Sequence, residues 1–354
     1  MQRSIVLTLI VVICLLGISG VLVLVTSAPL PLAPFAVPGQ TLEPDVNPNA
    51  NVLTERGAQV TVMTWNIAFG YGLGANSEDA PPRPEADQAQ RLAAIASFLK
   101  NNGPDVLLLQ EVDFHAKRSH LVDQYSYLMR EAGYSYGARV VNWSKRFIPW
   151  PLLRYWQWIG PMASGGAVLS RYPICGHRAY EHPLPIANNF LYNMYYMNPY
   201  TQLVRICAGN ESFFVLNSHF DTGSKIERER EARALERIVI EGRAAAAVAL
   251  VGGDFSSIPP EDPLQVVASE NAREGYRGDK TVAIVRAVPR LKDVFTKLTT
   301  HPTPELLRTY PVDRPDARLD YLFIDEAIAV SGVDVVRMTG TMSDHFPVRA
   351  TLRW

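Results

Sequence analysis

The sequence has little net charge, few cysteines and no recognisable nucleophile elbow around a serine or cysteine. Its 354 residues carry a formal net charge of −1, so no overall basic field indicates a non-specific nucleic-acid coat, although a nuclease with a local basic face stays open. Three cysteines cannot build a disulfide framework. Cys14 lies in the apolar N-terminus, and Cys175 and Cys207 are equally consistent with one bridge or with two buried thiols.

Charge is also absent from Ser4 to Val25, directly after the short positive start that includes Arg3. This run of about 22 residues is long enough to cross a bilayer, which needs about 20. A cleaved signal peptide has a shorter apolar core, of about 7–15 residues. The sequence therefore predicts that residues 1–27 form an uncleaved transmembrane anchor. The alternative is a signal sequence, which would give a secreted protein.

The distribution of basic residues predicts the orientation of this anchor. After Arg3 no basic residue follows until Arg56, so the N-terminus is expected in the cytoplasm and the body outside it. Residues 28–57 are rich in Pro, with Asn and Asp, and lack helical or strand periodicity, which predicts a semi-extended linker. Residues 58–354 are then expected to form the folded domain.

Within that domain, apolar strand-like runs repeatedly finish in, or lead into, a polar side chain. Helical patterns over residues 85–101 and 226–243 alternate with these runs, which indicates an α/β fold with sheets covered by helices. A single strand-end carboxylate is most often a solvated group, and a strand-end Asn is most often a turn former. Chance becomes a poor explanation for the full set, which is Asn66, Glu111, His219, Asp254, Asp320, Asp344 and His345.

These side chains indicate a particular chemistry if the strand ends meet at one edge. Carboxylates and imidazoles without paired cysteines suit a hard cation, Mg²⁺ or alternatively Mn²⁺, held by few protein oxygens and by substrate phosphate. With no serine or cysteine nucleophile in evidence, direct attack of water on phosphorus is the reaction that this set supports.

The motifs together resemble the endonuclease/exonuclease/phosphatase superfamily over nearly all of residue 60 to the C-terminus. The resemblance implies a four-layer α/β sandwich of two mixed β-sheets flanked by helices, and a Mg²⁺-dependent phosphoric ester hydrolase. The matching segments are Thr-Trp-Asn (64–66), Leu-Gln-Glu-Val (109–112), Leu-Ser-Arg-Tyr-Pro-Ile (169–174), Asn-Ser-His-Phe-Asp (217–221), Gly-Asp-Phe (253–255), Arg-Leu-Asp-Tyr (318–321) and Ser-Asp-His-Phe-Pro-Val (343–348).

The resemblance also implies a metal site and a departure from the family pattern. Glu111 would be the principal metal ligand, Asn66 would assist at the metal or the phosphate, and Asp344 is a further candidate ligand. The family usually has Asn two residues after the Asp of Gly-Asp, where this chain has Ser256. A hydroxyl reaches less far than an amide toward phosphate or water, so this position predicts altered specificity or weaker activity.

Catalytic roles follow from the same resemblance. Asp254 would orient or deprotonate the attacking water. His345 would hold a non-bridging phosphate oxygen, helped by Asp320 or Asp344. His219 would contact the phosphate or the leaving group. The choice of general base and general acid stays open, because it differs among members of the superfamily.

Two aromatic segments, 141–159 and 190–197, bear on the substrate. Trp and Tyr mixed with Arg and Lys suit the water–lipid interface, whereas covering the core and stacking on nucleobases are the alternatives. The favoured hypothesis is a membrane-anchored phosphodiesterase whose partners are the bilayer and a lipid or membrane-proximal phosphoester, with no obligate protein partner evident. The alternatives are an exported nuclease and a catalytically weak, membrane-tethered binding module.

Overall fold

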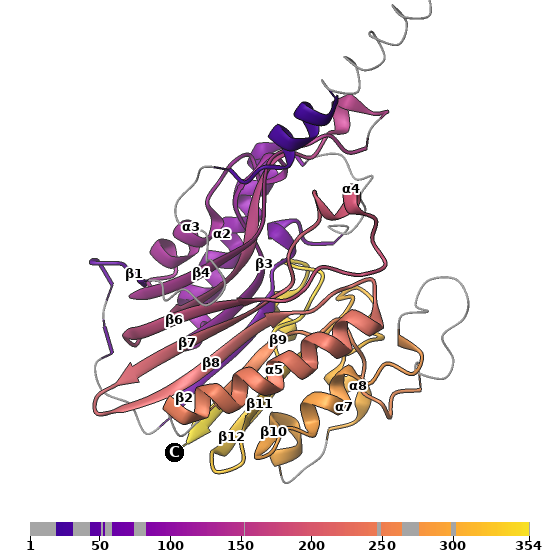
Figure 1. Ribbon diagram of the computed structural model, residues 1–354. Coiled ribbons are helices and arrows are strands. Elements are labelled where there is room, and N and C mark those ends of the chain that lie inside the picture. Colours follow the sequence, from indigo (N-terminus) through magenta and orange to yellow (C-terminus); the bar gives the residue numbers. More distant parts are fainter. Residues whose placement is uncertain are drawn as a thin grey trace, which may run out of the picture.

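Two β-sheets pack face to face and helices cover their outer faces, as Figure 1 shows. The computed structural model describes residues 19–30, 43–50, 52–53, 59–73, 83–151, 153–245, 249–263, 276–298 and 302–353. Among these residues the first sheet has seven strands, in the order β1 (Asp45–Val46), β4 (Tyr136–Ile148), β5 (Gly160–Ser170), β3 (Val106–Ala116), β2 (Val60–Asn66), β13 (Val348–Arg353) and β12 (Ala329–Val335).

The second sheet is also mixed. Its six strands within the described residues follow the order β10 (Leu291–Asp293), β11 (Asp320–Asp325), β9 (Ala249–Asp254), β8 (Glu211–His219), β7 (Tyr200–Ala208) and β6 (Ile174–Glu181). Each sheet contains one parallel pair, β2 with β3 and β8 with β9, and antiparallel neighbours elsewhere. The predicted architecture of two mixed sheets flanked by helices is confirmed.

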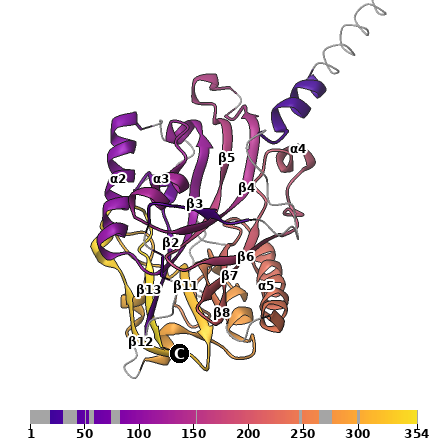
Figure 2. The same ribbon diagram turned by 90° about the vertical axis from the view of Figure 1, so that its left-hand side faces the viewer.

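Helices connect the two parallel pairs and cover the sheets from outside (Figure 2). Leu92, Ile95 and Leu99 form the buried face of α2 and pack with the outer side of the first sheet, as their spacing predicts. Besides the helical residues 19–27, the helices of the described residues are α2 (Glu85–Asn102), α3 (Gln124–Glu131), α4 (Phe190–Asn193), α5 (Lys225–Ala245), α7 (Thr281–Arg286) and α8 (Pro304–Leu307), and short 3₁₀ turns include η1 (Ala68–Gly70), η2 (Lys117–Ser119), η3 (Tyr155–Gln157), η5 (Val294–Lys297) and η6 (Arg337–Thr339).

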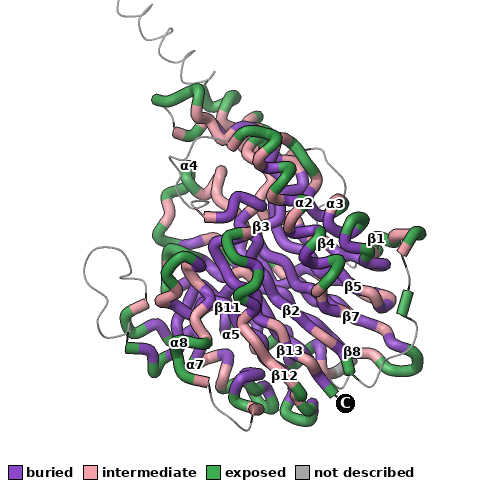
Figure 3. The backbone as a smooth tube through the Cα atoms, turned by 180° about the vertical axis from the view of Figure 1, so that it is seen from behind, coloured by how far each residue is buried: buried purple, intermediate pink, exposed green. Residues whose placement is uncertain are grey.

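Alternation along the strands divides the core into three layers. In β2, Val60 and Val62 belong to the cluster between the sheets, whereas Met63 and Trp65 face the helices of the outer layer. The same two-residue period separates inner from outer side chains in β8, β9 and β11. The buried segments along the middle of the tube in Figure 3 follow from this arrangement.

The N-terminal segments differ in part from expectation. Residues 19–27 are helical, but the rest of the predicted anchor lies outside the described residues, and no helix among the described residues is both long and apolar enough to span a membrane. Asp45–Val46, expected within the linker, instead pairs with β4 as an edge strand. The Tyr125 hydroxyl donates to the Asp45 carboxylate at 2.8 Å and fastens this strand to the domain.

Cys175 and Cys207 form a disulfide between the neighbouring strands β6 and β7. The sequence left this pairing open. The bridge closes a loop across 32 positions of sequence, and such a link stabilises a fold mainly by restricting the unfolded chain.

Reduction of this disulfide is expected to lower the free energy of unfolding by about 4 kcal/mol, the value that loop closure gives for a ring of this size. Urea unfolding with and without a reducing agent measures the change, and Cys175→Ser/Cys207→Ser provides the genetic counterpart. Equal stability of the oxidised and reduced proteins would contradict the expectation.

Two buried histidines predict acid sensitivity. Burial lowers the pKa of His177 and of His182 to about 4. The pKa of each histidine is lower in the folded than in the unfolded protein, so protonation favours the unfolded chain. The protein therefore has its full stability above about pH 6.5 and loses it as the pH falls toward about 4. At about pH 5 each histidine should lower the free energy of unfolding by about 2 kcal/mol. Urea unfolding at about pH 7 and pH 5 should show a smaller pH dependence in His177→Gln/His182→Gln than in the parent chain, and an unchanged dependence would refute this assignment.

Candidate active site

The predicted polar residues lie on the inner faces of their strands at one edge of the two sheets. In the second sheet, His219 on β8 is the register partner of Asp254 on β9, which is in turn the partner of Asp320 on β11. Three neighbouring strands thus present one row of side chains. Asn66 ends β2 on the inner face of the first sheet, on the same side as Val60 and Val62.

Glu111 reaches the site because β3 contains a bulge. Leu109 and Val112 face the outer helices, and the register with β5 shifts between them. Strict alternation would turn Glu111 outward with Leu109, but its φ of 54° redirects the chain. A non-glycine residue in this conformation costs of order 1–3 kcal/mol, which is typical of functional positions.

Gly166 on β5 lies opposite the bulge and leaves room beside it. A Cβ at this position would collide with the Tyr200 hydroxyl and the Leu109 carbonyl oxygen. Glycine is therefore required here by close packing of the two sheets beneath Glu111.

The closing segment docks on the first strand of the domain. The Ser343 hydroxyl donates to the carbonyl oxygen of Asn66 at 2.7 Å, and the Trp65 indole donates to the carbonyl oxygen of His345 at 3.0 Å. These two bonds hold His345 just before β13 and beside Asn66. The predicted meeting of the first and last motifs is thereby seen in the structure.

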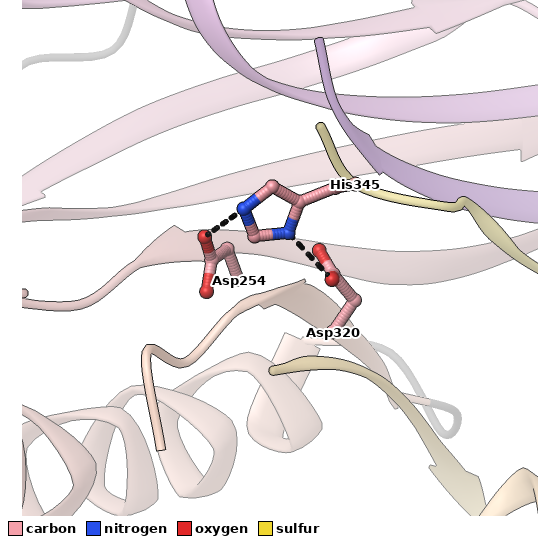
Figure 4. Close-up of side chains that lie close together, drawn as sticks. All are labelled: Asp254, Asp320 and His345. Atoms are coloured by element: carbon pink, nitrogen blue, oxygen red, sulfur yellow. Dashed lines mark hydrogen bonds and ion pairs between the residues drawn. The ribbon is translucent and has the colours of Figure 1, made fainter. Parts of the chain in front are cut away.

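His345 lies between two aspartates, as Figure 4 shows. Its Nδ1 is 2.8 Å from Oδ2 of Asp320, and its Nε2 is 3.7 Å from Oδ2 of Asp254. The ring also contacts Tyr310, with centroids 4.7 Å apart. Sequence alone left open whether Asp320 or the adjacent Asp344 assists His345; Asp320 makes the short contact, while Asp344 Oδ1 is 3.9 Å from Nε2.

The surrounding carboxylates favour a charged imidazole. Burial opposes the charge, but Asp320, Asp254 and Asp344 together raise the pKa of His345 well above its ordinary value. Burial likewise opposes ionisation of Asp254, yet His345 and His219 lower the pKa of this carboxyl. The arrangement therefore favours a positively charged imidazolium next to an ionised Asp254.

Asn66 connects the two carboxylates from opposite sheets. Its amide nitrogen donates to Glu111 at 3.1 Å and to Asp254 at 3.0 Å, while its oxygen accepts from the backbone nitrogen of Ala68 at 2.9 Å. In this orientation Asn66 positions Glu111 and Asp254 as a donor. A direct role for Asn66 as a metal ligand stays a prediction.

His219 also lies between Glu111 and Asp254. Its Nε2 is 3.9 Å from Glu111 Oε1 and 3.7 Å from Asp254 Oδ2, and among the described residues this buried nitrogen has no hydrogen-bond partner. Buried polar atoms are seldom left unpaired. An unpaired imidazole nitrogen between two carboxylates indicates that a phosphate oxygen or water completes the site.

Asp344 and Ser256 occupy the edges of the site. Burial raises the pKa of Asp344 to about 6, with His345 opposing and Glu111 reinforcing the shift. The Ser256 hydroxyl donates to the carbonyl oxygen of Phe220 at 3.2 Å, and its backbone nitrogen donates to Asp254 at 2.8 Å. Ser256 thus holds Asp254 in place through its backbone, at a φ of 46°.

The donor set fits a divalent cation. Ligand atoms of Asp254, Asp320 and His345 lie within 4.8 Å of one another, but the contact of His345 Nδ1 with Asp320 leaves that nitrogen little capacity for a metal. Glu111, which faces the cavity, offers carboxylate oxygen of the kind that Mg²⁺ prefers. Glu111 is therefore a better candidate ligand for the cation than His345, and Asp254 and Asp344 lie nearby.

A cavity of about 520 Å³ is lined both by this cluster and by aromatic side chains. Its lining includes Glu111, His219, Asp254 and His345. We call the aromatic part of the lining, which includes Phe69, Trp143, Trp158 and Tyr196, the aromatic arm, and Arg118 also belongs to the lining. Arg118 stacks on Phe69 with 3.3 Å between the guanidinium carbon and the ring centroid, and it forms an ion pair with Asp113 at 2.8 Å.

Sequence reasoning missed a buried network of amides beneath the site. Gln110 of the first sheet donates to Asn217 of the second at 2.6 Å, and Asn217 donates to Gln202 at 3.2 Å. Both Gln110 and Asn217 lie inside the matching motifs, next to residues that were singled out. Their presence in otherwise apolar strands was the available signal, since buried amides require partners.

Comparisons with known proteins agree with this geometry. The sequence profile of the Endonuclease/Exonuclease/phosphatase family matches residues 63–345. Among curated proteins, no sequence matches the chain. Similar solved structures include an endonuclease/exonuclease/phosphatase from Beutenbergia cavernae, which is 22% identical with a TM-score of 0.60 over 84% of this chain and 72% of that one.

Two further structures share the fold at lower identity. The mannosyl-6-phosphatase Bt3783 of Bacteroides thetaiotaomicron is 16% identical, with a TM-score of 0.56 over 83% of this chain and all of that one (100%). A humanized D. rerio TDP2 is 14% identical, with a TM-score of 0.54 over 84% of this chain and 100% of that one. The fold and the profile match over residues 63–345 establish that the chain belongs to the endonuclease/exonuclease/phosphatase family of phosphoester hydrolases.

Proposed function

We propose that this protein is a membrane-anchored, divalent-metal-dependent phosphodiesterase that acts on a lipid or other membrane-proximal phosphoester. The observation that carries the hydrolase assignment is the convergence of Glu111, His219, Asp254 and His345, from both sheets, in the lining of one cavity. Mg²⁺ is the proposed cation, and Mn²⁺ the alternative, because the available ligands are mainly carboxylate oxygens.

His345 binds the phosphate in this proposal. The imidazolium, oriented by Asp320 at 2.8 Å, presents Nε2 toward the cavity, where it donates to a non-bridging phosphate oxygen. Fixed positive charge at this point stabilises the negative charge that develops during attack. Tyr310 packs against the ring and limits its rotation.

Asp254 orients the attacking water and accepts its proton. Two imidazoles lower the pKa of Asp254 against the effect of burial, and Asn66 holds the carboxylate at 3.0 Å. His219, whose Nε2 lacks a hydrogen-bond partner among the described residues, contacts the phosphate or the leaving group. A bound cation would supply Lewis-acid stabilisation of the phosphoryl oxygens near Glu111.

The membrane assignment comes from the sequence and is supported by the disulfide. Residues 4–25 carry no charge, which suits an anchor with the N-terminus in the cytoplasm and the domain outside. A disulfide between Cys175 and Cys207 is typical of a protein in an oxidising compartment. Cleavage of the N-terminal segment would instead give a secreted enzyme.

Loss of the proposed metal ligand or of the phosphate-binding imidazole should abolish most activity. Glu111→Gln and His345→Asn are each expected to lower kcat for a phosphodiester by about 10²- to 10³-fold, because each removes a charge that acts in the transition state. Steady-state hydrolysis of bis(p-nitrophenyl) phosphate with Mg²⁺ measures the effect.

Two residues of the same types provide matched controls for these variants. Glu131 and His115 lie outside the cavity lining, so Glu131→Gln and His115→Asn should retain parental kcat. Thermal unfolding of all four variants verifies that they fold. Parental activity in both folded site variants would overturn the catalytic assignment.

A substrate screen of the full chain with Mg²⁺ or with EDTA tests the function itself. Hydrolysis of sphingomyelin or phosphatidylinositol that EDTA abolishes would support the proposal. Nicking of plasmid DNA without lipid cleavage would reassign the protein as an exported nuclease. Folded protein that hydrolyses no phosphoester would indicate the binding module, consistent with Ser256 in place of the usual Asn.

A further inference from the structure

Exposed apolar side chains gather at one end of the molecule, on three segments that are far apart in sequence. These segments are the helix at residues 19–27, residues 150–151 and 153–156 in the connection from β4 to β5, and residues 186–192 in the connection from β6 to β7. We call their exposed apolar side chains the apolar collar. Leu153 is 94% exposed, Ile186 77%, Phe190 75% and Leu24 64%.

Hydrogen bonds that lie in or next to these segments connect this part of the chain. The hydroxyls of Thr26 and Tyr195 lie 2.6 Å apart, and the backbone nitrogen of Arg146 donates to the carbonyl oxygen of Ala28 at 2.7 Å. The Trp143 indole donates to the carbonyl oxygen of Tyr195 at 2.8 Å, which joins β4 to the segment that carries α4. Figures 1 and 2 both show the helix at residues 19–27 beside this end of β4 and β5.

The composition of the collar segments is unusual for a protein surface. Residues 183–204 contain no charged side chain, and residues 147–153 contain none either. Contiguous exposed apolar surface normally marks a binding face. Tyr155 and Trp156, both exposed, belong to the residue types enriched where a membrane meets water.

The position of the collar indicates what covers it. The uncharged run of residues 4–25 shares residues 19–25 with the helix at residues 19–27. The segment that could enter a bilayer is therefore continuous in sequence with one of the three collar segments. Arg146, four residues before the second collar segment, and Arg154, within it, are exposed, and lipid phosphates would attract both cations. A bilayer surface satisfies both the apolar side chains and these cations.

Residues of these segments and residues close to them in sequence also line the catalytic cavity. Trp150, Trp158, Tyr196 and Met197 belong to the same cavity lining as Glu111. The collar segments therefore adjoin the aromatic arm. The Tyr196 hydroxyl donates to Asp221 at 2.9 Å, only two residues after His219, and this bond links the chain just after the third collar segment to the site.

We propose that the apolar collar is a bilayer-docking surface, which lies in the interfacial region of the membrane that holds the N-terminal run and sets the mouth of the cavity against the lipid headgroups. This consequence for the substrate rests on the proposed function: a phosphoester presented at the bilayer surface reaches Glu111 and His345 through the aromatic arm. The docking itself is a separate property, because it depends on the collar and not on catalysis.

Site-specific fluorescence of the full chain in vesicles tests the docking. In a Cys14→Ser background, Leu153→Cys and Met338→Cys are each labelled with the environment-sensitive dye NBD and reconstituted in vesicles of phosphatidylcholine and phosphatidylglycerol. Met338 is a matched control, because it is also apolar and 64% exposed but lies on η6, away from the collar. Cys175 and Cys207 are paired and should not react.

The label at position 153 should show blue-shifted emission that nitroxide-bearing lipids quench, and the label at position 338 should show neither effect. Equal behaviour of the two labels would overturn the docking surface. A blue shift at position 153 that depends on protein density, without quenching by nitroxide lipids, would assign the collar to contact between copies of the chain and would overturn it as well.

Hydrolysis of bis(p-nitrophenyl) phosphate by the same vesicles separates this inference from the proposed function. Quenching at position 153 without hydrolysis by any folded sample would support docking and refute the proposed function. Hydrolysis without quenching would refute docking and leave the phosphodiesterase assignment in place. Leu191→Cys, labelled in the same way, provides a second collar position in case the first variant does not fold.

Discussion

Contact between the two sheets through buried amides is the constraint on which the site depends. Gln110, Asn217 and Gln202 form a hydrogen-bonded series from β3 to β7, and Gln202 also lies 3.0 Å from Nε2 of His177. Unlike apolar packing, which tolerates sliding, buried amides lose their partners if one sheet shifts against the other. The inner-face side chains at the edge of both sheets are consequently held at fixed separations.

Each sheet contributes two residues to the site through a parallel pair of strands. A parallel pair joined by a helix, β2 and β3 in one sheet and β8 and β9 in the other, places two polar residues at one edge. Asn66 and Glu111 come from the first pair, and His219 and Asp254 from the second. The two sheets contribute differently, since the first offers Glu111, the carboxylate proposed to bind the cation, and the second offers the row of His219, Asp254 and Asp320.

Residue patterns were sufficient for an α/β fold and for the group of residues at the strand ends, because apolar periodicity and strand boundaries are local properties, whereas the two-sheet architecture came from the family resemblance. The sequence could not decide which aspartate serves His345: Asp344 is adjacent in sequence, but the pairing of β9 with β11 brings Asp320 to the shorter distance. It could not reveal that Glu111 needs a bulge to face inward. The edge strand at Asp45–Val46 was missed because its two residues carry no readable period.

The bonds between the first and last motifs have a consequence for biosynthesis. Trp65 and His345 are 280 residues apart in sequence, and Ser343 and Asn66 are 277 apart, yet they hold one another in place. A growing chain therefore lacks both His345 and the contacts that seat Asn66 until residues 343–345 have been made. The site stays incomplete until then, and it is assembled only when β13 joins the sheet beside β2.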